Sequence, residues 1–69
     1  MEWQKVESSN VAAFGYKAEE RELHIRFNSG AEYVYFDVPA NVVQAFMEAD
    51  SKGRYLNENI KGVYEFVKA

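Results

Sequence analysis

The sequence contains no cysteine and a single histidine, His24, in 69 residues. The lack of cysteine excludes disulfide bonds and thiolate metal sites. One imidazole is too little for a typical zinc site or for a Cys–His pair, so we expect no cofactor and no bound metal. A short chain without such cross-links must be stabilised by side-chain packing, as is typical of cytoplasmic proteins. We therefore expect one domain, residues 1–69, in the cytoplasm.

The sequence also has no long apolar run. No stretch approaches the roughly 20 apolar residues of a membrane-spanning helix, and no basic segment followed by an apolar run resembles a secretion signal. We therefore expect a soluble protein that does not contact membranes. The net charge of −3 has the wrong sign for general attraction to phosphates. The charge is uneven, because residues 51–69 hold four cations against two carboxylates.

The first half of the chain has the patterns of strands. Residues 10–16 are rich in small, β-branched and aromatic side chains. Residues 22–27 alternate polar with apolar side chains, which is the period of a half-buried strand. Residues 28–30 have the composition of a turn, and residues 31–38 form the next run. These features predict a three-stranded antiparallel meander.

The length of the loop at residues 28–30 decides which side chains of this hairpin face the core. A three-residue loop with Gly30 in the left-handed region is a common connection. It sets Arg26 opposite Glu32, a favourable pair of opposite charges, whereas an even-numbered loop would set Glu32 opposite a phenyl ring. We prefer the three-residue loop, which places one apolar set on the core face: Leu23, Ile25, Phe27, Tyr33 and Tyr35. The opposite face then carries His24, Arg26, Glu32, Val34 and Phe36.

The second half of the chain has the patterns of helices. Val38-Pro39 ends the last strand, because the residue before a proline takes extended geometry and proline suits a first helical turn. Residues 40–49 repeat apolar side chains at helical spacing, and Ser51 is a candidate N-cap for a second helix that ends near Gly62. Residues 63–67 form either a short strand or a cover over the core. The predicted fold class is therefore α+β: a three-stranded antiparallel β-meander followed by two helices packed on one face, with a possible short C-terminal strand.

Several short motifs share their order and spacing with a known family. They are Ser9-Asn10-Val11, Gly15-Tyr16, Leu23-x-Ile25-x-Phe27, Tyr33-Val34-Tyr35, Val38-Pro39, Ala49-x-Ser51-x-Gly53-Arg54-Tyr55-Leu56-Asn57 and Ile60-Lys61. Together they resemble the KTSC domain, which is found at the C-terminus of some lysyl-tRNA synthetases and as small stand-alone proteins, and which has a central Tyr-x-Tyr. Where that family often carries Tyr-Phe-Asn, this sequence has Leu56. The resemblance implies no established activity, and RNA binding is implied by association alone.

The densest polar cluster lies at the start of the second predicted helix. Free N–H groups and the helix dipole at such a position can receive an anion. The candidate binding residues are Ser51, Lys52, Arg54, Tyr55, Asn57 and Lys61. The alternative is structural: Ser51 caps the helix, Gly53 permits close packing, and Asn57 ties down a neighbouring loop.

Tyr33 and Tyr35 are secondary candidates, because aromatic side chains on sheets can stack nucleotide bases, at about 1–3 kcal/mol per base. The structural alternative, which the preferred register favours, places both in the core. Asn10 is the third secondary candidate, since it could hydrogen-bond a ligand, although polar clusters before strands more often form local turns.

The sequence offers no catalytic set: it has neither a Ser–His–acid arrangement nor a glycine-rich phosphate loop. We expect a non-catalytic binding or accessory domain. The acidic balance favours an unknown protein partner, bound at an exposed sheet edge or on the Val34 and Phe36 side of the sheet. The alternative is an RNA- or tRNA-binding accessory domain that uses the basic second helix. We expect a monomer or a weak homodimer.

Overall fold

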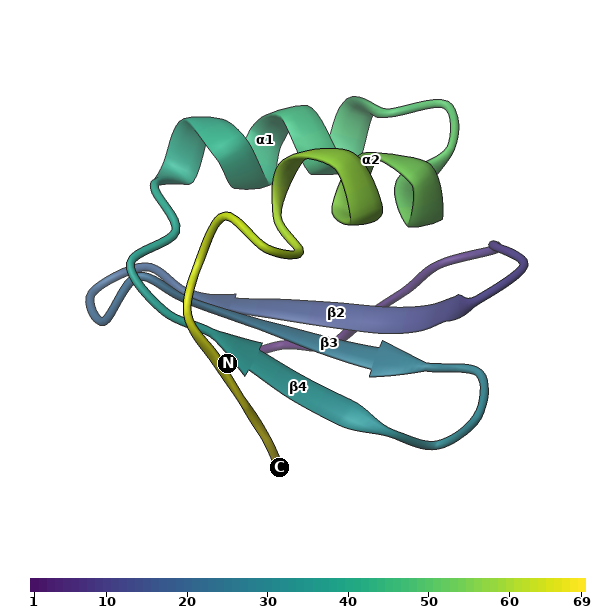
Figure 1. Ribbon diagram of the computed structural model, residues 1–69, viewed down its shortest axis with the longest axis horizontal. Coiled ribbons are helices and arrows are strands. Elements are labelled where there is room, and N and C mark those ends of the chain that lie inside the picture. Colours follow the sequence, from purple (N-terminus) through teal and green to yellow (C-terminus); the bar gives the residue numbers. More distant parts are fainter.

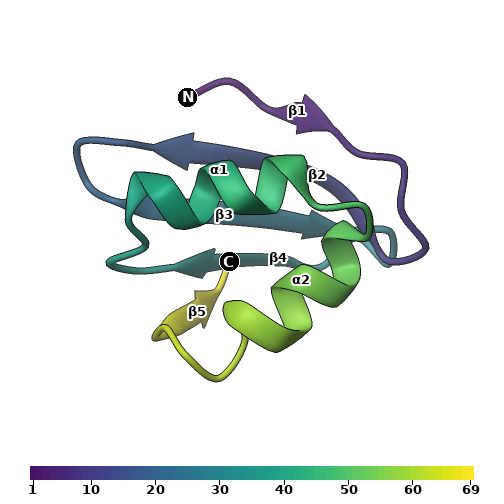
Figure 2. The ribbon, with the colours of Figure 1, turned by 90° about the horizontal axis from the view of Figure 1, so that it is seen from above.

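An antiparallel sheet is covered on one face by two helices in the computed structural model, which describes all residues 1–69 (Figure 1). The strands and helices follow in the order β1 (Gln4–Lys5), β2 (Val11–Lys17), β3 (Glu22–Phe27), β4 (Glu32–Tyr35), α1 (Ala40–Glu48), α2 (Lys52–Asn59) and β5 (Phe66–Lys68). The strands lie in the sheet in sequence order, and each neighbouring pair is antiparallel. Seen from above, α1 and α2 lie side by side over the sheet (Figure 2). No helix has the length and apolar character needed to cross a membrane.

The α+β class is confirmed, but the prediction of three strands is wrong, because the sheet has five. Strand β1 is only two residues long and has no alternating pattern by which the sequence could reveal it. The short C-terminal strand exists, but it begins at Phe66 rather than at residue 63. A turn precedes the strand, since the backbone N–H groups of Val63 and Tyr64 both donate to the carbonyl of Ile60.

The preferred register of the β3–β4 hairpin is confirmed. Arg26 lies opposite Glu32, and their side chains approach to 3.2 Å. Gly30 takes a φ of 93°, a conformation that favours glycine. The predicted apolar set therefore packs beneath the helices, either buried or at the margin of the core: Leu23, Ile25, Phe27, Tyr33 and Tyr35.

The opposite face of β4 is less open than expected. Val34 is buried, because His24 on β3 and Val67 on β5 lie directly across from it. Strand β4 also ends earlier than predicted, since Asp37 has a φ of 58° and turns the chain out of the sheet. The Val34 and Phe36 side is therefore not the uncovered apolar surface that the sequence led us to expect.

The position of α2 depends on two local features. The Ser51 side chain caps the helix, accepting a hydrogen bond from the backbone N–H of Arg54 at 3.3 Å. Gly53 lets the Asn10 side chain lie against the helix, because a Cβ atom at residue 53 would overlap the Asn10 amide. The turn before β2 and the start of α2 are thus held together.

Candidate functional site

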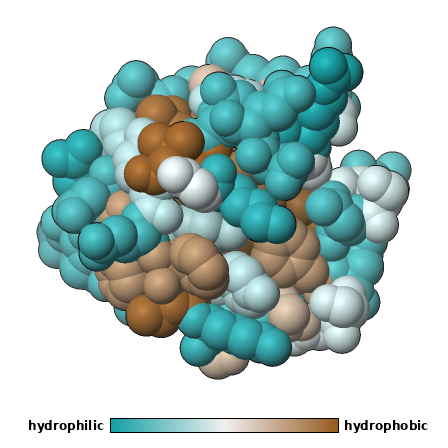
Figure 3. Space-filling model, in the orientation of Figure 1, coloured by the Kyte–Doolittle hydropathy of each residue, from teal (hydrophilic) through white to brown (hydrophobic).

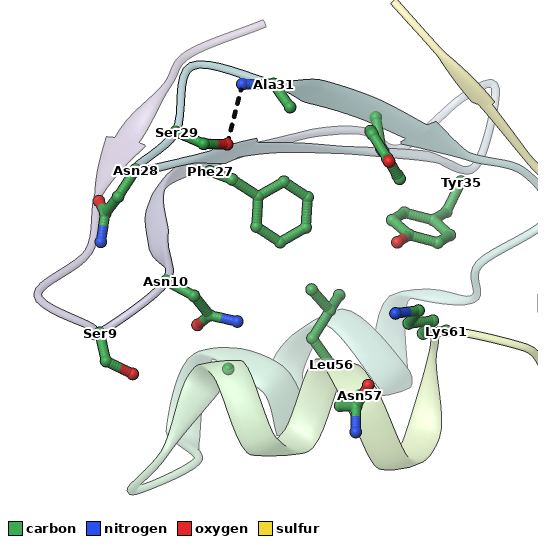
Figure 4. Close-up of a pocket in the computed structure, with 12 residues that line it drawn as sticks. Ser9, Asn10, Phe27, Asn28, Ser29, Ala31, Tyr35, Leu56, Asn57 and Lys61 are labelled. Atoms are coloured by element: carbon green, nitrogen blue, oxygen red, sulfur yellow. Dashed lines mark hydrogen bonds between the residues drawn. The ribbon is translucent and has the colours of Figure 1, made fainter.

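A cleft of about 460 Å³ opens between α2 and the end of the sheet near the β3–β4 turn (Figure 4). Its sheet side is aromatic and is formed by Phe27, Tyr33 and Tyr35. Its helix side is formed by α2, which contributes Leu56 and Asn57 among others. The hairpin register turns both tyrosines toward the helix side, where Tyr35 is almost fully buried and Tyr33 stays partly exposed at the cleft.

The lining of the cleft contains no carboxylate, although the protein has 11 acidic residues. Three asparagines, two serines and one lysine supply its side-chain polar groups apart from the tyrosine hydroxyls: Ser9, Asn10, Asn28, Ser29, Asn57 and Lys61. The amides and hydroxyls both donate and accept hydrogen bonds, whereas the ammonium group only donates and is the only charge among them. The lining therefore suits a polar ligand that is neutral or negatively charged.

Tyr35 gives the cleft an unusual polar group. Its side chain is only 1% exposed, and its hydroxyl points into the cleft (Figure 4). Burial raises the pKa of Tyr35, with a further contribution from Tyr33, so the hydroxyl stays protonated and able to donate at neutral pH. The Tyr35 hydroxyl can therefore donate to a ligand that enters the cleft.

Asn10 is oriented by its neighbours so that its amide reaches the cleft. Its Oδ1 accepts a hydrogen bond from Ser8 Oγ at 3.2 Å, which leaves Nδ2 directed into the cleft (Figure 4). Asn57 and Lys61 lie on the helix side, across from Phe27 and Tyr35. Donors from three separate parts of the chain thus surround one space.

The cleft brings together five of the nine residues that the sequence marked as candidates. These are Asn10, Tyr33, Tyr35, Asn57 and Lys61. Sequence reasoning had placed them in separate candidate groups. It did not mark Phe27, Asn28 or Ser29, which also line the cleft. The predicted register, which sets Phe27 on the same face as the two tyrosines, was the signal that could have identified Phe27.

The other four candidates lie at the start of α2, and each has a contact within the protein. Ser51 caps the helix, and Lys52 Nζ donates to the backbone carbonyl of Ala49 at 3.2 Å. The remaining two contacts involve neighbouring side chains: the Arg54 guanidinium lies 3.2 Å from the Glu58 carboxylate, and the Tyr55 ring lies 6.3 Å from that of Phe46 between centroids. These contacts are internal to the two helices, so we restrict the candidate site to the cleft.

No metal centre accompanies the cleft. The structure has no group of three or more His, Cys, Asp or Glu side chains that could hold an ion. His24 Nε2 lies 3.2 Å from the Glu22 carboxylate, on the face of the sheet opposite the cleft. The arrangement therefore offers hydrogen bonding and aromatic contact rather than metal chemistry.

Comparison with known proteins places these features in a family context. Residues 7–64 match the KTSC domain. An uncharacterized protein of Stutzerimonas stutzeri is 46% identical over 56 residues, which are 81% of this chain and 79% of that protein. A lysine–tRNA ligase of Nostoc punctiforme is 40% identical over 62 residues, which are 90% of this chain but 11% of the ligase. The crystal structure of a KTSC domain protein from Yersinia pestis is similar with a TM-score of 0.95 at 38% identity, covering 99% of this chain and 96% of that one.

Proposed function

The chain belongs to the KTSC domain family, and we propose that it is a non-catalytic binding domain whose cleft receives an unpaired nucleotide of RNA. The observation that carries this proposal is the combination of a polar lining without carboxylates and the Tyr35 hydroxyl, which points into the cleft beside the aromatic rings. Together they describe a site for a planar ligand with many acceptors.

A nucleotide supplies the groups that this lining can bind. Proteins recognise single-stranded RNA by packing bases against aromatic rings and by hydrogen bonds to base edges. Phe27 and Tyr33 offer aromatic surface, while Asn10 Nδ2 and the Tyr35 hydroxyl offer hydrogen bonds to ring nitrogens and carbonyl oxygens. Lys61 offers the charge for a phosphate.

The relatives support RNA as the source of the nucleotide. One relative is a lysine–tRNA ligase, in which a similar domain is joined to an enzyme that acts on tRNA. Joining raises the effective concentration of the RNA at the domain, so weak binding is sufficient. The charges also predict weak binding, because the cleft has a single lysine and the protein has a net charge of −3.

An NMR titration of labelled protein with tRNA and with a short single-stranded oligoribonucleotide tests this function. We expect shifts at Asn10, Phe27, Tyr35, Asn57 and Lys61. The affinity should depend only modestly on salt, because each neutralised phosphate of a single strand contributes a slope of about −0.7. The Tyr35→Phe variant should weaken the binding. An absence of shifts at low salt, or shifts confined to residues 51–55, would refute the assignment of the cleft.

The expected protein partner remains a second candidate, because the edge strand β5 exposes Phe66 and Val67 by about half. An edge strand has unpaired backbone groups that can accept another strand. A second copy of the chain is the partner that can be tested directly, by sedimentation velocity over a wide range of concentrations. Self-association that Val67→Lys abolishes and Tyr35→Phe leaves unchanged would support this candidate.

A further inference from the structure

We infer that Phe66 provides a second stacking surface beside the cleft, so that the domain holds two unpaired nucleotides rather than one. This inference rests on the proposed function and extends it to a residue outside the cleft. The family match ends at residue 64, so the inferred surface lies beyond the matched segment.

The Phe66 ring is joined to the cleft through Tyr33. The two rings are stacked, with 5.2 Å between their centroids and an angle of 4° between their planes. Tyr33 lines the cleft, and Phe27 meets it nearly edge-on at 5.4 Å. Phe66 is therefore the outermost ring of an aromatic row that begins inside the cleft and ends on the surface.

The outer side of this row is accessible. Phe66 is 49% exposed, and it lines a shallow surface hollow formed by residues 62–66. Tyr33 stacks on its ring and the Tyr35 ring lies 5.6 Å away between centroids, so another flat ring would contact the part of Phe66 that these two leave exposed. Stacking of this kind accepts any base, because every base has a π-face.

The shape of the surface favours bases over a continuous apolar partner. The face that carries β4 and β5 shows several small apolar areas separated by hydrophilic side chains (Figure 3). Such separate apolar areas suit the separate bases of a single strand better than one continuous apolar partner.

The nearby charges fit the path of an RNA backbone. Lys61 lines the cleft, and Lys68 lies opposite Tyr33 in the β4–β5 pairing. One cation thus lies at the cleft and a second lies beside Tyr33 in the sheet, and each of them can contact a phosphate. Glu65 lines the hollow with Phe66, so a neutral base is favoured there over a phosphate.

The test compares the wild type with the Phe66→Leu and Phe66→Ala variants. The probes are AMP and oligoadenylates of two, three and six nucleotides, titrated at low salt and followed by NMR or calorimetry. The wild type should bind the trinucleotide at least about fivefold more tightly than AMP, which is the lower limit for one additional stacked base. Both variants should lose that gain and bind AMP within about a factor of two of the wild type.

Phe66→Leu keeps an apolar side chain against Tyr33. It therefore removes the aromatic ring without exposing the Tyr33 side of the cleft, and it serves as the control for a disturbed cleft. Folding of each variant is checked by its NMR spectrum. A Phe66→Leu variant that keeps the full gain for the trinucleotide would overturn the second stacking surface while leaving the cleft in place. If neither AMP nor any oligonucleotide binds the wild type, both the proposed function and this inference fail.

Discussion

Helices α1 and α2 lie over the same face of the sheet (Figure 2), but the cleft opens beside α2. Helix α1 buries Val43 and Phe46, and the Phe46 ring meets Phe14 edge-on at 5.2 Å. Helix α2 buries only Leu56, and the cleft opens beside it. The difference follows from sequence, because α2 has the residues KGRYLNEN, most of which are polar. Leu56, the C-cap Ile60 and the partly buried Tyr55 hold this polar helix on the core, and the rest of its inner side leaves room for a ligand.

The two tyrosines under these helices differ in the same way. The Tyr16 hydroxyl donates to the backbone carbonyl of Val38 at 2.6 Å. The Tyr35 hydroxyl instead points into the cleft (Figure 4). The Tyr16 hydroxyl therefore serves the fold, whereas the Tyr35 hydroxyl faces the space that a ligand would occupy. Substitutions on the two sides should consequently affect different properties.

The largest effect is expected on the α1 side. Phe46→Ala removes a fully buried ring and should lower the free energy of unfolding by about 3–5 kcal/mol. For a domain of this size such a loss brings the protein close to unfolding. Urea denaturation followed by circular dichroism measures it. A loss below about 1 kcal/mol would show that the packing of α1 on the sheet contributes little to stability.

A matched pair of hydroxyl deletions separates the two tyrosines. Tyr16→Phe should cost about 1–2 kcal/mol, because it leaves the Val38 carbonyl without its donor. Tyr35→Phe should change the free energy of unfolding by less than about 0.5 kcal/mol, since its hydroxyl points into the cleft. Urea denaturation of both variants, together with titration of oligoadenylate, distinguishes them. Equal costs would mean that the Tyr35 hydroxyl has a structural role.

The hairpin and its inward-facing tyrosines could be predicted from the sequence because their determinants are local. Gly30 fixes the turn, and the Arg26–Glu32 pair favours one register. The α2 N-cap was predictable for the same reason, since Ser51 acts within one helical turn. All of these features depend on residues that lie close together in the chain.

The cleft could not be predicted, because contacts between distant residues create it. Asn10 packs against Gly53, which is 43 positions away in the sequence, and this contact fixes the distance of α2 from the sheet. Phe66, which stacks on Tyr33, lies in β5, and this strand is too short to show an alternating pattern in the sequence. Patterns within a segment do not reveal which segments approach one another. The candidate residues were therefore found in separate groups, but not as one site.

The contact between Gly53 and Asn10 can be measured by a double-mutant cycle. Gly53→Ala should gain about 1 kcal/mol from helix propensity. In the wild-type background most of this gain should be lost, because the new Cβ displaces the Asn10 side chain. In the Asn10→Ala background the full gain should appear in urea denaturation. The same gain in both backgrounds would show that the contact does not position α2.

The smallest effect is the pH dependence of stability, and it concerns Tyr35, on the α2 side. Burial raises the pKa of Tyr35 above its ordinary value of 10.0, so above pH 10 the folded state holds this proton more tightly than the unfolded state does. The resulting stabilisation is complete below pH 10 and is lost as the pH rises through the pKa of the folded state. The difference in unfolding free energy between the wild type and Tyr35→Phe should therefore be constant from neutral pH to about pH 9. Above pH 10 the wild type should lose stability relative to the variant.

A constant difference up to pH 11 would mean that the Tyr35 hydroxyl is as well solvated in the folded protein as in the unfolded chain. The cleft would then be more open than the burial of Tyr35 indicates.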